Sequence, residues 1–151
     1  MDYYTPKETT QIFLDSVQEK TSTSWMKFCV MAILGGAFIA LGGLLSVMVS
    51  GGMTEIGSVN PGLIKFVAGA LFPVGLIMVS IGGVDLFTSN CASFTLSGME
   101  RQINWKLFLN YLLFSYLFNF VGTQLIAYFL TYKVGLLQTE PWLSYMHQYA
   151  E

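Results

Sequence analysis

The stretch "GGVDLFTSNCASF", Gly82 to Phe94, decides the fold of this chain, because it places polar side chains inside a long apolar region. On a continuous helix that faced lipid, Asp85 would cost about 2.5 to 3.5 kcal/mol. Thr88, Ser89 and Asn90 follow it and add groups that need hydrogen-bond partners. Because irregular backbone is tolerated in a membrane where protein buries it or water lines it, we predict a helix that is interrupted here. A continuous polar helix buried in a bundle stays the alternative.

The composition places the chain in a membrane. Of its 151 residues 54% are hydrophobic and only 11% are charged, whereas soluble domains carry roughly 25% charged residues. The net charge of -2 argues against a nucleic-acid-binding protein, which needs Lys and Arg clustered on one face. Cys29 and Cys91 lie apart in apolar runs, and His147 lies near the end of the chain, so we expect no metal site, no cofactor and no enzyme activity.

Three apolar runs are long enough to cross a hydrocarbon core of about 30 Å. We predict an all-α membrane protein with transmembrane helices over residues 27–50, 63–84 and 105–132. The second helix is predicted to be broken by a loop at 85–92 and to resume at 93–99. Pro73 lies inside this second helix, where neighbouring helices can satisfy the carbonyl group that it leaves free.

The segments outside these helices indicate an orientation. Residues 1–26 have the mixed charge of a cytoplasmic segment, with a short amphipathic helix that begins near Pro6 and Thr9, and residues 134–151 form a polar tail. Five cations lie on the amino-terminal side and two on the other, so the positive-inside bias predicts a cytoplasmic amino terminus and an extracytoplasmic tail. The five are Lys7, Lys20, Lys27, Arg101 and Lys106, and the two on the other side are Lys65 and Lys133.

Small residues recur along the first predicted transmembrane helix. Ala32, Gly36 and Ala40 are four residues apart, and Gly35 and Gly43 are eight apart. Small side chains at this spacing allow close approach of another helix. The pattern favours helix packing, with a pore wall as the alternative.

Four motifs then carry a resemblance to a known family. "GGVDLFTSN" is similar to the Gly-x-(Glu/Asp)-Leu-Phe-Thr-(Ser/Gly) signature of the formate/nitrite transporter family, in which it forms a loop that interrupts the second transmembrane helix. "KFCVMAILGGAFIALGG" resembles the glycine-rich first helix of that family, and "NPGLIKFVAGALFPVGLIMV" resembles its helix before the break. "NWKLFLNYLLFSYLFNFVG" resembles its third helix, with the Asn-x-x-Gly pattern at Asn119 to Gly122.

This resemblance implies an aquaporin-like fold. Members of the family have six transmembrane helices in two inverted three-helix repeats, and five such chains form a pentamer with one pore in each chain. They are multi-pass proteins of the plasma membrane or the bacterial inner membrane, and they move small monovalent anions such as formate or nitrite, commonly with a proton. By this resemblance the chain corresponds to one repeat with a broken second helix, and it would form a homopentamer when full length.

The resemblance also implies roles for particular residues. Leu86, Phe87 and Thr88 match the loop that lines the outer constriction, Phe72 matches the aromatic residue that closes it, and Leu76 matches the inner constriction. Ordinary helix packing stays the alternative for the apolar members of this set. Lys20 matches a basic vestibule position, with a solvated lysine as the alternative. The loop residues Asp85, Ser89 and Asn90 are assigned a structural role, Asp85 by accepting backbone amide hydrogens rather than by contact with the substrate.

The sequence departs from the family pattern in one large respect. The fourth, fifth and sixth helices have no counterpart here, and with them go a pore histidine and a second basic residue; His147 does not match that histidine. We therefore expect an incomplete transporter, a fragment with one of its two repeats. Antiparallel pairing of two half-chains would need dual topology, which the cation bias disfavours. The alternative function is that of a membrane subunit that does not transport.

Overall fold

The computed structural model describes residues 3–150, with side chains through Gln148, and every regular element in that range is helical. The parts of the predicted terminal segments at residues 1, 2 and 151 lie outside the described residues. The elements, in chain order, are α1 (Pro6–Ser22), α2 (Trp25–Gly51), α3 (Thr54–Val59), α4 (Pro61–Leu71), α5 (Pro73–Gly82), α6 (Phe87–Met99), α7 (Trp105–Ile126), the π-helix η1 (Ala127–Lys133) and α8 (Trp142–Ala150).

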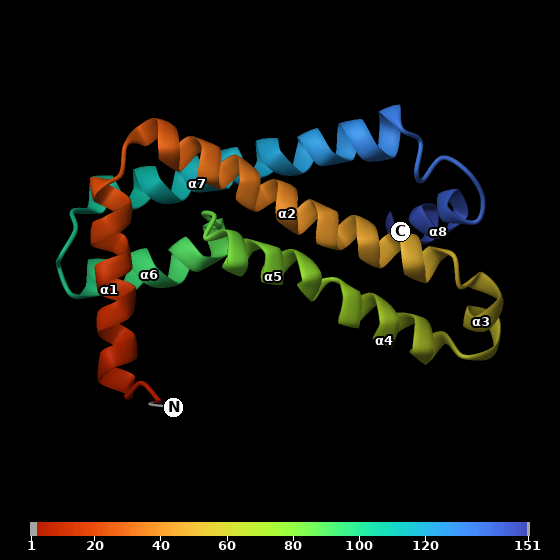
Figure 1. Ribbon diagram of the computed structural model, residues 1–151, viewed down its shortest axis with the longest axis horizontal. Helices are drawn as coiled ribbons and strands as arrows, with labels where there is room; N and C mark the ends of the chain where they lie inside the picture. Colours follow the sequence, from red (N-terminus) through yellow and green to blue (C-terminus); the bar gives the residue numbers. More distant parts are fainter. Residues whose placement is uncertain (1–2, 151) are drawn as a thin grey trace.

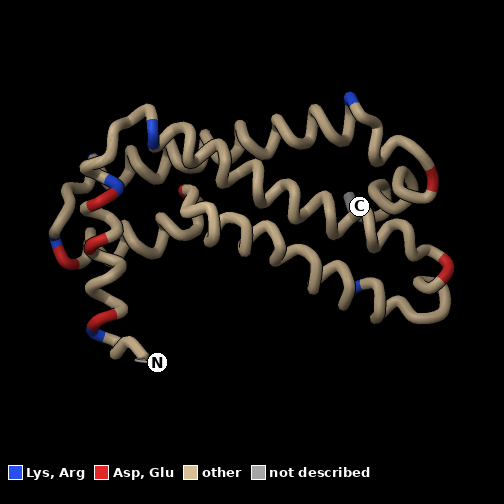
Figure 2. Tube along the Cα trace, viewed as in Figure 1, with Lys and Arg blue, Asp and Glu red and all other residues tan. Residues whose placement is uncertain are grey.

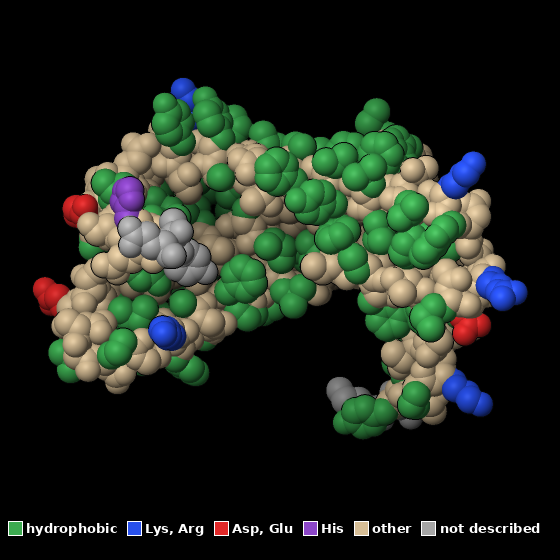
Figure 3. All heavy atoms as spheres, turned by 180° about the vertical axis from the view of Figure 1, so that it is seen from behind, with side chains coloured by type: hydrophobic (Ala, Val, Ile, Leu, Met, Phe, Trp, Pro, Cys, Tyr) green, Lys and Arg blue, Asp and Glu red, His purple; other side chains and the backbone are tan. Residues whose placement is uncertain are grey.

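Within the described residues, three helical stretches are long and apolar enough to cross a membrane, namely Trp25–Gly51, Pro61–Gly82 and Trp105–Lys133. They begin and end within a few residues of the predicted transmembrane helices. Figure 2 shows that the charged residues gather toward the two ends of the bundle. Seen from behind, apolar side chains cover the middle of the molecule (Figure 3). An apolar belt between charged ends is what a multi-pass membrane protein requires.

Helix α2 is the centre of the bundle, with α4 and α5 on one side and α7 on the other (Figure 1). The α2–α7 contact is close because both helices have glycine where they meet. A Cβ atom added to Gly36 would overlap the carbonyl oxygen of Asn119, and one added to Gly122 would overlap that of Ile33. The small residues at Ala32 and Gly36 are buried in the structure, which favours the packing interpretation of this pattern over the pore wall.

Helix α1 crosses the end of the bundle and packs on α6 (Figure 1). It begins with a capping box, in which the Thr5 amide donates to Glu8 Oε2 (2.6 Å) and the Glu8 amide donates to Thr5 Oγ1 (3.4 Å). The hydrogen bond from Thr5 lowers the pKa of Glu8. Leu14 and Val17 form the buried face of α1, so packing against α6 holds the helix on the bundle.

Two local features differ from the sequence-based expectation. Pro73 is the first residue of α5, where a helix needs no amide hydrogen, so it breaks no hydrogen bond in a helix interior. The tail predicted as polar contains α8, which folds back on α2. There the Trp142 indole Nε1 donates to the Met48 carbonyl at 2.8 Å.

Candidate functional site at the helix break

The interruption of the second span is shorter than predicted. Helix α5 ends at Gly82, and α6 already begins at Phe87, so the non-helical segment covers residues 83–86 instead of 85–92. Gly83 turns the chain with φ 59° and ψ 27°, a left-handed conformation that glycine adopts without strain. Leu86 is extended (φ -123°, ψ 130°) and leads into α6. Ser89 and Asn90, which were expected in the loop, therefore lie in the first turns of α6.

The neighbouring helices satisfy the backbone of this break. The Asp85 amide donates to the Met31 carbonyl of α2 at 3.2 Å. The side chain of Asn119, on α7, accepts from the Phe87 amide at 2.8 Å and donates to the Asp85 carbonyl at 3.1 Å. Since protein groups replace the missing helix hydrogen bonds, the break is compatible with a position inside the membrane. The contact at Phe87 also explains why α6 begins early, because it caps the first amide of the helix.

Beside the break lies a buried polar cluster formed by Lys20, Asp85, Asn90 and Ser115. Lys20 Nζ lies 2.7 Å from Asp85 Oδ1 and donates to Asn90 Oδ1 at 2.5 Å. Asn90 Nδ2 donates to Asp85 Oδ2 at 2.6 Å and to Ser115 Oγ at 2.9 Å. Ser115 Oγ donates in turn to Asp85 Oδ2 at 3.1 Å. Each carboxylate oxygen thus has a partner, which compensates for the removal of its charge from water.

This cluster corrects the predicted role of one residue. Asp85 was expected to fix the loop by accepting backbone amide hydrogens. Among the described residues it instead forms an ion pair with Lys20 and accepts hydrogen bonds from the side chains of Asn90 and Ser115. The side chain that binds the loop backbone is Asn119. The sequence could not distinguish the two because a side-chain amide and a carboxylate can both accept an amide hydrogen.

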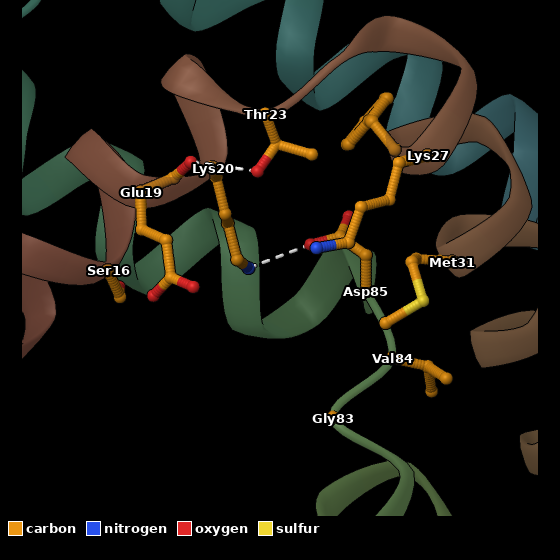
Figure 4. A pocket seen from close by; sticks show the side chains of 10 residues that line it. Ser16, Glu19, Lys20, Thr23, Lys27, Met31, Gly83, Val84 and Asp85 are labelled. Carbon is orange, nitrogen blue, oxygen red and sulfur yellow. Dashed lines mark hydrogen bonds and ion pairs between the residues drawn. The ribbon is translucent and has the colours of Figure 1, made fainter.

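Lys20 also lies differently from a freely solvated lysine. It reaches from α1 to Asp85, as Figure 4 shows. A cavity of about 170 Å³ lies here between α1, the start of α2 and the break. Its lining residues include Glu19, Thr23 and Lys27. The ion pair therefore joins α1 to the break at the wall of this cavity.

A second cavity, of about 440 Å³, lies on the α5 side of the break. It brings together Leu76, Leu86 and Thr88 of the predicted pathway with Ser89 of the predicted loop. Its apolar wall and two hydroxyl groups at the start of α6 suit a small molecule with one polar end. The remaining lining residues are Val79, Ser80, Gly83 and Val84.

Two of the predicted pathway residues do not line this cavity. The Phe87 ring packs edge-on against Tyr116 of α7, with centroids 5.4 Å apart. Phe72 lies between α4 and α5 and is 48% exposed. It is four residues before Leu76, so the two side chains lie on one face of the helical stretch. Phe72 thus shares a face with Leu76 but is not among the residues that line the cavity.

Several residues of the site escaped the sequence-based prediction, among them Ser80, Ser115 and Asn119. Ser80 is four residues after Leu76, and helical spacing alone could have added it to the cavity wall. Ser115 and Asn119 lie four residues apart on α7, and a polar pair on one face of an apolar helix is a signal for contact with other polar groups. Within residues 3–150, no group of three or more His, Cys, Asp or Glu side chains could hold a metal ion.

The fold and the site together define a class of protein, a multi-pass α-helical membrane protein with an interrupted span. Its break is packed between neighbouring helices and borders a cavity, an arrangement that transport proteins use. Residues 7–151 match the sequence profile of the family described as Formate/nitrite transporter. The chain belongs to the formate/nitrite transporter family, and the resemblance inferred from the four motifs is confirmed.

Individual relatives agree with this assignment. A probable formate transporter of Methanothermobacter thermautotrophicus is 37% identical over 93% of this chain and 51% of its own length. A formate channel of Bacillus thuringiensis is 32% identical over 91% of this chain and 52% of its own length. A formate-nitrite transporter of Entamoeba histolytica is 30% identical over 99% of this chain and 41% of its own length. These names are those of transporters and channels, not of enzymes.

The chain spans about half the length of these curated relatives. No solved structure gives a significant match.

Proposed function

We propose that this chain forms one wall of a transmembrane pathway for small monovalent anions such as formate or nitrite, with transport linked to a proton. The chain would supply one three-helix repeat of an aquaporin-like protein. A second repeat would supply the opposite wall, and five such units would assemble as a pentamer. The relatives named as formate transporter and formate channel support this substrate class.

One observation carries the proposal, namely the cavity beside the break. Leu76 and Leu86 line it with apolar side chains and would form the constriction, and Thr88 is exposed at the start of α6 on its wall. An unpaired anion in an apolar constriction costs many kcal/mol, whereas the neutral acid passes at much lower cost. Thr88 would donate a hydrogen bond to an oxygen of the substrate. The proton linkage follows, because a weak acid that crosses in its neutral form carries a proton with it.

Thr88→Ala is expected to lower the uptake of labelled formate about tenfold, because it removes a hydrogen bond to the substrate inside the constriction. The measurement uses proteoliposomes that hold this chain alone or together with the carboxyl-terminal half of the Methanothermobacter relative. Thr95→Ala is the matched control. Thr95 is an exposed threonine on the same helix that lines a different cavity, so its loss should leave uptake unchanged.

Phe72→Ala tests the wall that leads to the cavity. Removal of the ring should widen the path and reduce the preference for formate over larger acids such as lactate. Phe66→Ala serves as the control, because Phe66 is 71% exposed on α4. Equal effects of the two variants on this preference would remove Phe72 from the pathway.

If neither the chain alone nor the paired halves take up formate, the alternative of a subunit that does not transport is favoured.

Acidification outside the liposomes should raise formate uptake. Well above the pKa of formic acid, the neutral fraction of the acid rises about tenfold for each unit by which the pH is lowered, so initial uptake should rise as the external pH falls. An ionophore that removes the pH difference should remove the effect. Uptake that is independent of pH would contradict the proton linkage.

The proposal includes an orientation. The amino terminus and α1 would lie in the cytoplasm, since five of the seven Lys and Arg residues flank the spans on that side. The tail with α8 would then lie outside. A single cysteine at exposed Ser144, in a chain without Cys29 and Cys91, should react with an impermeant thiol reagent added to intact cells.

A further inference from the structure

We propose that Asn119 of α7 is a positioning residue that fixes the shape of the helix break, and with it the places of Leu86 and Thr88 on the cavity wall. The inference rests on the proposed function for its consequence in transport. Its structural part stands on hydrogen bonds alone.

The side-chain amide of Asn119 joins both sides of the break. Its oxygen accepts from the Phe87 amide at 2.8 Å, and its nitrogen donates to the Asp85 carbonyl at 3.1 Å. The second hydrogen of the same nitrogen is directed to the Ala32 carbonyl of α2 at 2.6 Å. A primary amide has two donors on one atom and an acceptor on the other, and all are used here. Leu86 lies between the two bridged residues, so the amide determines the direction of its backbone.

The base of this side chain is itself held firmly. Gly36 of α2 packs directly against the Asn119 backbone, where a Cβ atom would overlap the carbonyl oxygen. One turn later, Thr123 Oγ1 lies 3.0 Å from the Asn119 carbonyl and 3.3 Å from the Gly36 carbonyl. Close packing of this kind leaves a side chain little freedom to move. The break is therefore bound to a rigid part of the bundle and not to a loop.

Asn119 does not line the cavity beside the break. Its effect on the substrate must therefore pass through the backbone of Asp85 and Phe87, which it binds and which sets the positions of Leu86 and Thr88. The alternative is that Asn119 only stabilises the contact between α2 and α7. Thr123 lies on the same face of α7 and joins α7 to α2, but it has no hydrogen bond to the break. Substitution of Thr123 is therefore the matched control.

Hydrogen–deuterium exchange of the whole chain in nanodiscs tests the inference. Asn119→Leu removes the bridge with a side chain of similar size. We expect exchange in the peptide covering residues 83–90 to rise about tenfold or more, because the Phe87 amide loses its acceptor and the break opens locally. Peptides from the middle of α2 and α7 should be unchanged. Thr123→Val should leave the exchange of residues 83–90 as it is.

Exchange that rises throughout the bundle, or equally in both variants, would overturn the positioning role, and so would an unchanged rate at 83–90. If Asn119→Leu does not fold, Asn119→Asp carries the test, because it keeps an oxygen for the Phe87 amide and loses both amide hydrogens. In this variant the exchange rate of residues 83–90 should rise less than it would if the whole bridge were lost. The rise should still be confined to the break.

Formate uptake adds a second readout. Asn119→Asp should lower it, whereas Thr123→Val should not. If equal uptake is seen in both variants, Asn119 has no positioning role in transport. Should even the unmodified chain, alone or paired with the second half, take up no formate, the proposed function fails, and the exchange result still decides whether Asn119 fixes the break.

Discussion

Gly36→Ala should prevent α2 and α7 from packing as they do, although it adds only one methyl group. The added Cβ would overlap the Asn119 carbonyl oxygen and press on the backbone carbon atoms beside it. Backbone cannot rotate away as a flexible side chain can, so the two helices would have to separate. We expect a loss of about 3 kcal/mol or more in the free energy of unfolding. The measurement is the unfolding midpoint of purified protein in mixed micelles.

The same substitution at Gly69 provides the control. A Cβ added there would meet no atom within 4 Å, and Gly69 lies in α4 on an exposed position. Alanine favours a helix over glycine by about 1 kcal/mol, so Gly69→Ala should be neutral or slightly stabilising. Similar losses at both positions would show that the close contact between α2 and α7 is not what Gly36 provides.

The second large effect is expected from Lys20→Met. This change leaves the Asp85 carboxylate, whose side chain is only 6% exposed, without its cation. Loss of one partner from a buried ion pair costs about 3 to 5 kcal/mol because the remaining charge is uncompensated. We therefore expect strong destabilisation and detachment of α1, to be followed by the unfolding midpoint and by proteolysis within residues 6–22.

Two further variants separate the ion pair from other effects. Lys27→Met removes a lysine that lines the same cavity and is exposed, so it should change stability by less than about 0.5 kcal/mol. Lys20→Met combined with Asp85→Asn removes both charges and should recover much of the loss. A double variant as unstable as Lys20→Met alone would mean that the charge of Asp85 is not the cause.

The sequence predicted well those features that depend on nearby residues. Three long apolar runs are enough to identify the spans, because a helix that crosses lipid needs about 20 predominantly apolar residues. A carboxylate followed by hydroxyl and amide groups was enough to predict the interruption near Asp85 and, with three other motifs, the family. Leu76, Leu86 and Thr88 do line one cavity. Their role in transport stays a prediction.

The sequence predicted less well the features that depend on distant partners. The start of α6 was predicted too late in the chain. The first amide of this helix is capped by Asn119, which is 32 residues further on. The role of Asp85 was misassigned because its cation comes from α1 and a donor comes from Ser115 on α7. The contact of the Phe87 ring with Tyr116 of α7 was likewise not foreseen, and the role of Phe87 in the pathway stays a prediction.

The sequence by itself therefore determined that this chain is a helical membrane protein of the formate/nitrite transporter family with a broken second span. That follows because the length of an apolar run and the order of motifs are properties of the linear sequence and need no tertiary structure to be recognised. Only the tertiary structure decided how the break is held. Its backbone groups and its buried charge find partners on α1, α2 and α7. Which distant residue supplies each partner depends on how the helices pack and rotate against one another, and no local pattern fixes that.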